Sequence, residues 1–131
     1  MTTLGLNHYN LRAQPELLEK LRRFYCDVVA LRVGFRPAFK SSGYWLYAGD
    51  QAVLHLSQAA PDEQLSLAAM TTFSHVAFSC TDVASFEQRL KHHGVDYRVT
   101  HVPQTEQVQL FCRDPAGNGV ELNFSSEDVQ D

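Results

Sequence analysis

The stretch Phe73–Cys80, which reads FSHVAFSC, decides the fold of this chain. Its β-branched and aromatic residues predict a short strand, and side chains on a strand alternate between two faces. One face of this strand carries His75 with two small side chains, Ala77 and Ser79, as expected on the floor of a cleft. A lone histidine in an apolar strand is more often structural than a ligand, so the rest of the chain decides its role. The opposite face of the same strand is apolar and suits a packed core; it holds Val76, Phe78 and Cys80.

The composition is ordinary for a globular chain: 131 residues, of which 44% are hydrophobic and 20% charged. This length allows one domain or two half-size units that share a core. A net charge of −4 argues against a nucleic-acid surface, which needs a concentrated basic field. Three irregularly spaced cysteines do not make a disulfide framework, and no apolar run approaches the roughly 20 residues that span a bilayer. We therefore expect a cytoplasmic protein that binds neither membrane nor nucleic acid.

Residues 4–57 have the pattern of a β-α-β-β-β module. Pro15 suits the first turn of a helix, and apolar residues follow it at helical spacing up to Val28. The turns are marked by Ser41–Gly43 and Gly49–Asp50. The predicted strands are Leu4–Arg12, Leu31–Phe35, Tyr44–Ala48 and Ala52–Ser57.

The same order restarts in a second module, residues 73–124. Thr81 or Asp82 can cap a helix that ends near Gly94. The predicted strands of this module are Phe73–Cys80, Val95–His101, Glu106–Cys112 and Gly119–Phe124.

Residues 58–72 are interpreted as a linker, in which Leu65–Met70 could form a helical turn. The acidic tail, residues 125–131, is expected to fray. The predicted fold class is α+β, with two tandem βαβββ modules in one domain that spans residues 1–131.

The two modules carry ligand-type side chains at equivalent positions. His8 and His75 lie 75 − 8 = 67 positions apart, and His55 and Glu121 lie 121 − 55 = 66 positions apart. Each of the four points away from the apolar face of its strand. A four-stranded sheet with its helix on one face keeps the other face concave. The first and last strands of two modules related by a pseudo-twofold can therefore line one cleft.

Imidazoles and a carboxylate in one cleft are the nitrogen and oxygen ligands that divalent transition metals favour. Three or four protein ligands would leave positions open for substrate. The same ligand set suits zinc, nickel, manganese and iron. The alternative is that His55 and Glu121 are ordinary exposed strand residues. The candidate metal ligands are His8, His55, His75 and Glu121.

Further side chains are candidates for the lining of this cleft. Trp45 and Tyr47 share strand parity and would form an aromatic wall for an apolar or planar substrate; alternatively they belong to the core or to a dimer interface. The candidate substrate-binding residues are Asn10, Trp45, Tyr47 and Asn123, and other candidates for the lining are Phe73, Ser79 and Gln109. Three arginines could hold a substrate carboxylate, and the sequence does not select among them: Arg12, Arg36 and Arg98.

Four segments resemble the vicinal oxygen chelate superfamily, which includes glyoxalase I, fosfomycin-resistance thiol transferases, bleomycin-resistance proteins and extradiol dioxygenases. The segments are Gly5–His8, Phe24–Tyr25, Phe73–Phe78 and Arg113–Leu122. The resemblance covers about residues 4–124, and it is more specific for the fold than for the reaction. It implies paired βαβββ modules that form a cupped mixed sheet of the glyoxalase/bleomycin-resistance type. It also implies a metal at the module interface and a homodimer whose sites can draw on both chains.

On this resemblance, His8, His75 and Glu121 match the three ligand positions shared by the metal-dependent members. His55 falls where glyoxalase I has an additional glutamate ligand, so it would bind the metal or act as a base. The glutathione-binding residues of glyoxalase I have no clear counterpart here. The phosphonate- and potassium-binding loop of the fosfomycin transferases is absent from Val95–Gln107. The pattern resembles small glyoxalase-like proteins most.

The sequence therefore predicts a divalent-metal-dependent, glyoxalase-like lyase or isomerase that acts on a small oxygen-chelating substrate. His55 and Glu121 would be its catalytic residues, and the metal would chelate two substrate oxygens and stabilise an enediolate or oxyanion. One alternative is a metal-free binding protein of the bleomycin-resistance kind that uses the same cleft for an aromatic ligand. Ring-cleaving extradiol dioxygenase and thiol transferase activities are further alternatives.

Overall fold

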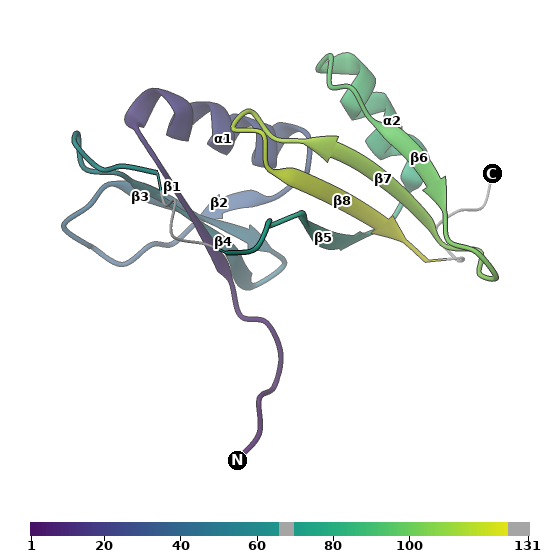
Figure 1. Ribbon diagram of the computed structural model, residues 1–131, viewed down its shortest axis with the longest axis horizontal. Helices are drawn as coiled ribbons and strands as arrows, with labels where there is room; N and C mark the ends of the chain where they lie inside the picture. Colours follow the sequence, from purple (N-terminus) through teal and green to yellow (C-terminus); the bar gives the residue numbers. More distant parts are fainter. Residues whose placement is uncertain (66–69, 126–131) are drawn as a thin grey trace. The chain divides into compact units, whose positions relative to one another are not determined.

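The computed structural model describes residues 1–65 and 70–125, and the chain forms two compact units, residues 1–65 and 66–131. Both units have the element order β-α-β-β-β, so the predicted fold class is confirmed (Figure 1). Unit 1 contains β1 (Tyr9–Ala13), α1 (Pro15–Asp27), β2 (Arg32–Gly34), β3 (Gly43–Ala48) and β4 (Gln51–Gln58). Unit 2 contains β5 (His75–Cys80), α2 (Val83–His92), β6 (Arg98–His101), β7 (Val108–Arg113) and β8 (Gly119–Phe124).

The two sheets have the same topology. Their strand orders are β1-β4-β3-β2 and β5-β8-β7-β6. In each sheet the first strand pairs in parallel with the last strand, whereas the other pairs are antiparallel. The helix between the first two strands covers one face of its sheet, so both parallel strands present their other side chains on the opposite, open face.

The core of unit 1 lies between α1 and its sheet. Pro15 occupies the first turn of α1, where its missing N–H costs no hydrogen bond. Tyr44 on β3 donates a hydrogen bond from its hydroxyl to Glu19 of α1 at 3.1 Å, which ties the helix to the sheet. The buried apolar side chains of this layer include Leu18, Leu21, Tyr25, Leu46, Leu54 and Leu56.

The core of unit 2 repeats this arrangement. The Asp82 carboxylate accepts a hydrogen bond from the Ser85 backbone N–H at 3.2 Å, so Asp82 is the cap that the sequence offered as one of two choices. Cys112 is buried in this core, and burial raises the pKa of its thiol to about 11. The side chains packed between α2 and the sheet include Phe86, Leu90, Leu110, Val120, Leu122 and Phe124.

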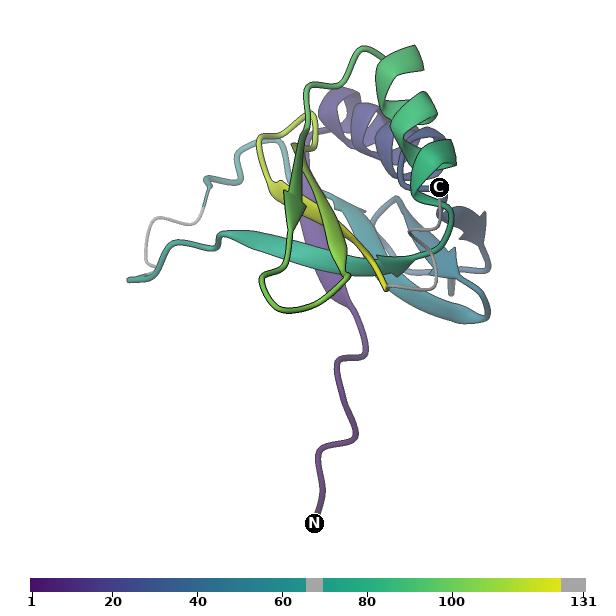
Figure 2. The ribbon, with the colours of Figure 1, turned by 90° about the vertical axis from the view of Figure 1, so that its right-hand side faces the viewer.

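The first strand is shorter than the sequence predicted. It begins at Tyr9 rather than Leu4, and the pairing with β4 also starts there; Gly5, with a φ of +152°, is far from regular strand geometry. Leu4 and Leu6 are consequently exposed, and the segment that contains them runs away from the sheet (Figure 2). His8 therefore lies immediately before β1 rather than within it.

Several other strands also begin later than predicted, namely β2, β5, β6 and β7, whereas β8 has the predicted bounds. The predicted helical turn at residues 65–70 and the tail after residue 125 fall largely outside the described residues. Neither α1 nor α2, the helices of the described part of the chain, is long and apolar enough to cross a membrane.

The Glu19 contact allows a test of how α1 is held. Hydrogen bonding to the Arg22 guanidinium, with help from the Tyr44 hydroxyl, lowers the pKa of Glu19 from 4.5 to about 2. A carboxyl whose pKa is lower in the folded state stabilises the fold above its unfolded pKa and loses that effect as pH falls. We expect Glu19→Gln to lower the Tm by a few degrees at pH 7. This difference should shrink between about pH 4.5 and pH 2, as measured by circular dichroism. Glu16→Gln on the same helix is the control, and an E19Q deficit that persists at pH 2 would contradict the linkage.

Candidate functional site

In unit 1 the candidate site is built around His55, at the middle of β4. Its cross-strand partners are Asn10 on β1 and Trp45 on β3. The Trp45 ring stacks on the His55 imidazole, with centroids 4.0 Å apart and planes inclined by 10°. The His8 ring also stacks on His55, at 3.8 Å and 13°. The His55 imidazole is therefore held between two rings and is only 8% exposed.

Burial, reinforced by the neighbouring His8, lowers the pKa of His55 below its usual value. The neutral imidazole, which can bind a metal or accept a proton, is thus the favoured form at neutral pH. His8 is exposed, and its Nδ1 lies 2.8 Å from the Asn7 Oδ1. Because His8 precedes β1, its ring can turn away from the stack without disturbing a strand.

An open groove of about 570 Å³ lies beside this ring stack. Trp45 and Tyr47 both line it, although the β3–β4 register shifts between Leu46 and Tyr47, and the Tyr47 hydroxyl donates to the Phe35 carbonyl oxygen at 2.7 Å. Their role toward a substrate stays a prediction. The sequence reasoning missed Phe39, which sits in the loop before β3, with its ring 6.1 Å from that of Trp45. The groove is lined by Asn7, His8, Phe39, Trp45, Tyr47, Asp50, Gln51, Ala52 and His55.

Asn10, a predicted substrate-binding residue, is exposed and does not line this groove. Its side-chain oxygen accepts a hydrogen bond from the Ser57 hydroxyl at 2.9 Å. The contact joins β1 to β4 on the side of the sheet that carries His55. A role of Asn10 toward substrate stays a prediction.

In unit 2 the candidate site is built around Glu121, a carboxylate that is 5% exposed. Its Oε1 lies 3.2 Å from the His75 Nε2. Its Oε2 accepts hydrogen bonds from the Gln109 side-chain amide at 3.1 Å and from the Asn123 side-chain amide at 3.0 Å. The other ring nitrogen of His75, Nδ1, lies 3.0 Å from the Ser74 hydroxyl. Polar neighbours therefore orient both members of the pair.

Asn123 was predicted to contact substrate, and Gln109 to line the cleft. In the structure both are hydrogen-bond partners of the buried carboxylate. Such partners were not foreseen, because they depend on which residues the β7–β8 register places beside Glu121. Two amide donors on one oxygen leave the other oxygen of Glu121 directed at His75.

The β7–β8 turn sets the position of Glu121. The buried Asp114 carboxylate accepts three hydrogen bonds of 2.9 Å, from the Ala116 and Asn118 backbone N–H groups and from the Asn118 side-chain amide. Gly119 follows, and a Cβ at this position would lie 2.2 Å from the Ser74 carbonyl oxygen. Only glycine allows β8 to approach β5 this closely at His75.

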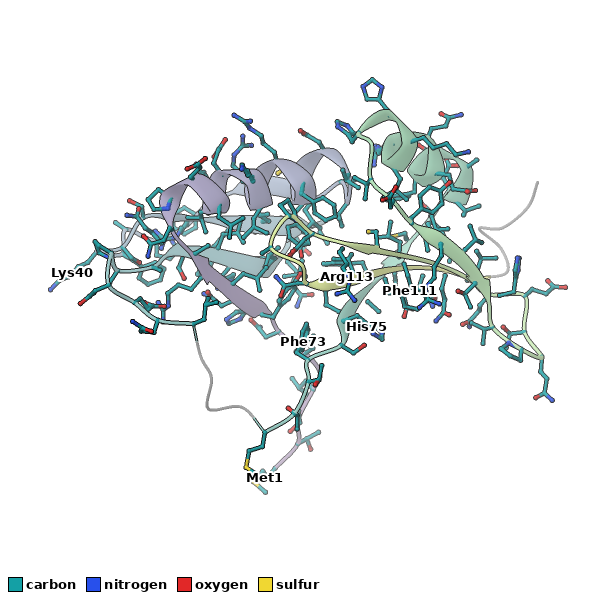
Figure 3. The ribbon with its side chains drawn as sticks, turned by 45° about the horizontal axis from the view of Figure 1, so that its top comes forward. Met1, Lys40, Phe73, His75, Phe111 and Arg113 are labelled. Carbon is teal, nitrogen blue, oxygen red and sulfur yellow. The ribbon has the colours of Figure 1, made fainter. Side chains whose placement is uncertain are left out.

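Within each unit, strand pairing places the candidate residues at corresponding register positions. Cross-strand pairing aligns Asn10, His55 and Trp45 in unit 1, and Ala77, Glu121 and Phe111 in unit 2. An aromatic ring thus flanks the candidate ligand of the last strand in both units. In unit 2 the Phe111 ring lies edge-on to His75, with centroids 5.6 Å apart (Figure 3).

The chemistry of these residues fits a divalent cation. Two ligands that are each about 2.1 Å from an ion and at right angles to one another lie about 3 Å apart, close to the 3.2 Å between His75 and Glu121. Unit 1 offers two imidazoles, of which His8 would have to turn out of the stack. In the part of the chain that the structure describes, no third His, Cys, Asp or Glu joins either pair within its unit. Each unit thus offers two candidate donors among its described residues.

Comparison with known proteins gives a consistent result. Residues 5–122 match the sequence profile of the Glyoxalase/Bleomycin resistance protein/Dioxygenase superfamily. Glyoxylase I 4 of Arabidopsis thaliana is 28% identical over 123 residues, which cover 90% of this chain and 69% of that protein.

Two solved structures share the fold. A protein from Bacillus anthracis described as a glyoxalase family member has a TM-score of 0.74 and 24% identity, covering 95% of this chain and 98% of that chain. A mutant of the fosfomycin resistance protein FosX from Listeria monocytogenes, in complex with Mn(II) and 1S,2S-dihydroxypropylphosphonic acid, has a TM-score of 0.69 and 17% identity. That match covers 95% of this chain and 94% of the FosX chain.

The amide contacts of Glu121 lead to a stability prediction. Gln109→Leu removes one donor from a buried carboxylate, and we expect the free energy of unfolding to fall by about 1 to 2 kcal/mol. Urea denaturation measures this loss. Gln107→Leu, at an exposed position just before the same strand, should change stability much less. In a Glu121→Gln background the Gln109→Leu loss should shrink. Equal losses in both backgrounds would show that the contact with the carboxylate is not the cause.

Proposed function

This chain belongs to the Glyoxalase/Bleomycin resistance protein/Dioxygenase superfamily, and from that premise we propose that it is a divalent-metal-dependent enzyme of the glyoxalase-like lyase or isomerase type. Its substrate would be a small molecule that offers two neighbouring oxygen atoms. One observation carries the proposal: each unit brings a pair of metal-binding side chains into contact at equivalent places, His8 with His55 and His75 with Glu121.

This proposal keeps the four candidate ligands that the sequence predicted. His8, His75 and Glu121 would be ligands, and His55 would be a fourth ligand or the base. The metal could be zinc, nickel, manganese or iron, because imidazole and carboxylate suit all four. The Mn(II) in the FosX complex is a precedent within the same fold.

A bound divalent cation would supply Lewis acidity that polarises substrate oxygens. The protein contributes orientation and proton transfer. Ser74 fixes the His75 ring, and the two amides hold Glu121 so that its Oε1 stays available. The neutral His55 ring can accept a proton from a substrate carbon or hydroxyl at a ring nitrogen. Trp45 holds that ring in place, and the aromatic side of the groove would cover an apolar part of the substrate.

The homodimer and the cytoplasmic location belong to the same proposal. The homodimer rests on the family pattern, and the location rests on a composition without a disulfide framework. The similarity to Glyoxylase I 4 favours lyase or isomerase chemistry among the activities of the superfamily.

Metal content tests the proposal. Protein purified without an affinity tag or chelator should contain close to one divalent ion per chain by elemental analysis. His75→Ala, Glu121→Ala and His8→Ala should each lose most of it, because removing one of three ligands leaves an incomplete centre. His92→Ala, a change on the exposed end of α2, is the control and should retain the metal. Variants that keep the wild-type metal content would refute the assignment.

The groove in unit 1 supports a second candidate function, a metal-free binding protein. Three aromatic side chains, Phe39, Trp45 and Tyr47, line a groove large enough for a small planar ligand. Trp45 is the single tryptophan of the chain, so its fluorescence reports on this groove directly. Ligand-induced quenching that is unchanged by a chelator would favour this function. Quenching that disappears with the chelator favours the metal-dependent enzyme.

A further inference from the structure

The structure distinguishes among the arginines that the sequence left equivalent. Arg12 pairs with Glu63 at 2.8 Å. Arg36 donates to the Ser41 carbonyl oxygen at 2.9 Å and leans over the Phe39 ring. Arg98 differs from both: among residues 1–65 and 70–125, no hydrogen bond or ion pair holds its guanidinium. Its charge is therefore free to bind a ligand.

Arg98 is exposed on the edge strand β6, and its Cζ lies 4.7 Å from the centre of the Phe111 ring. A cation over an aromatic face is attracted to it without losing its hydrogen-bond donors. Phe111 pairs across the sheet with Arg98 on one side and with Glu121 on the other. Cross-strand partners lie on the same face, so the guanidinium shares the open face with the candidate metal pair.

The same face of unit 2 carries a second guanidinium closer to the turn. Arg113 lies on β7, two residues beyond Phe111, and its Nη1 donates to the Gly117 carbonyl oxygen at 2.9 Å (Figure 3). That contact occupies part of Arg113 and directs it to the turn. The Glu121 carboxylate has its own amide and imidazole partners. Among the described residues of this face, Arg98 is thus the arginine whose guanidinium has no hydrogen bond or ion pair.

We propose that Arg98 binds an anionic group of the substrate, on the opposite side of Phe111 from Glu121 in the cross-strand register. This inference rests on the proposed function and makes it more specific. The substrate class is a small oxygen chelator that also bears a carboxylate or phosphate-type oxyanion, which the planar guanidinium can bind with two N–H groups. Arg98 then determines specificity, because it binds the end of the substrate that does not react.

Arg89 provides a matched control. Its Cζ lies 5.2 Å from the Phe86 ring, and within the described residues no hydrogen bond or ion pair holds its guanidinium. It belongs to α2, on the covered side of the same sheet. Arg98→Met and Arg89→Met therefore remove the same charge and the same cation–π contact, from the open face and from the helix respectively.

The first experiment tests the anion site alone. Acetate and, separately, inorganic phosphate are titrated into the full chain with a chelator present, and the Nε–H signals of the arginines are followed by NMR. The Arg98 signal, assigned from its loss in Arg98→Met, should shift and saturate with at least one anion, whereas the Arg89 signal should not. The anion that saturates the Arg98 signal at the lower concentration shows whether carboxylate or phosphate is preferred. Equal shifts at both arginines, or no shift at Arg98, would overturn the inference.

The second experiment tests the connection to chelation. With Mn²⁺ present, calorimetry compares 2-hydroxyglutarate with 2-hydroxypentanoate, which has a methyl group in place of the second carboxylate. The same comparison between glycerate 3-phosphate and glycerate covers a phosphate tail. In each pair, one acid has a second anionic group and the other lacks it. Wild type and Arg89→Met should bind the acid with the preferred second anionic group about tenfold more tightly than the acid without it, as expected for a charge-assisted contact. Arg98→Met should bind the two members of that pair equally.

The outcomes separate the two proposals. An Arg98→Met protein that keeps the preference for the acid with a second anionic group would overturn the role of Arg98. If wild type binds no acid in a Mn²⁺-dependent manner, the proposed metal function fails. In that case the chelator experiment still decides whether Arg98 forms an anion site.

Discussion

The parallel pairing of the first strand with the last strand is the interaction on which both units depend. It joins β1 to β4 and β5 to β8, strands that lie more than 30 residues apart in the chain. The crossover through a helix covers one face of each sheet, so the other face collects side chains from the two ends of the module. His75 and Glu121 come into contact for this reason, although 121 − 75 = 46 positions separate them. Gly119 is needed because β8 approaches the backbone before His75 too closely for any Cβ.

The two units stabilise their candidate ligands by different physical means. In unit 2 a buried charge is made tolerable by hydrogen bonds, because Gln109 and Asn123 replace the water that Glu121 loses. In unit 1 burial favours the neutral imidazole of His55, and ring stacking with Trp45 and His8 supplies the contacts. For the proposed metal, the pair in unit 2 would therefore need no rearrangement, whereas in unit 1 His8 would have to leave the ring stack.

The sequence was sufficient for the fold because its signals are local. Pro15 marked the start of α1, the Gly49–Asp50 segment marked the turn between β3 and β4, and the alternation in Phe73–Cys80 assigned the faces of β5. The candidate ligands followed from the internal repeat. Contacts that depend on the register between two strands could not be predicted, because a local sequence pattern does not indicate which residues of the two strands lie opposite each other. The stacking of Trp45 on His55, the amide partners of Glu121 and the distinct position of Arg98 all belong to this group. The first strand was predicted too long because the apolar residues Leu4 and Leu6 continue the alternation of β1 past Gly5, which does not have strand geometry.

The matching registers of the two sheets have an evolutionary consequence. A single-module ancestor that paired with a second copy would carry identical side chains at both equivalent places. Two modules in one chain can carry different side chains at equivalent places, and here a histidine stands in β4 where a glutamate stands in β8, and a tryptophan in β3 where a phenylalanine stands in β7. The two modules therefore offer an imidazole and a carboxylate at this place, a combination that two identical modules could not supply.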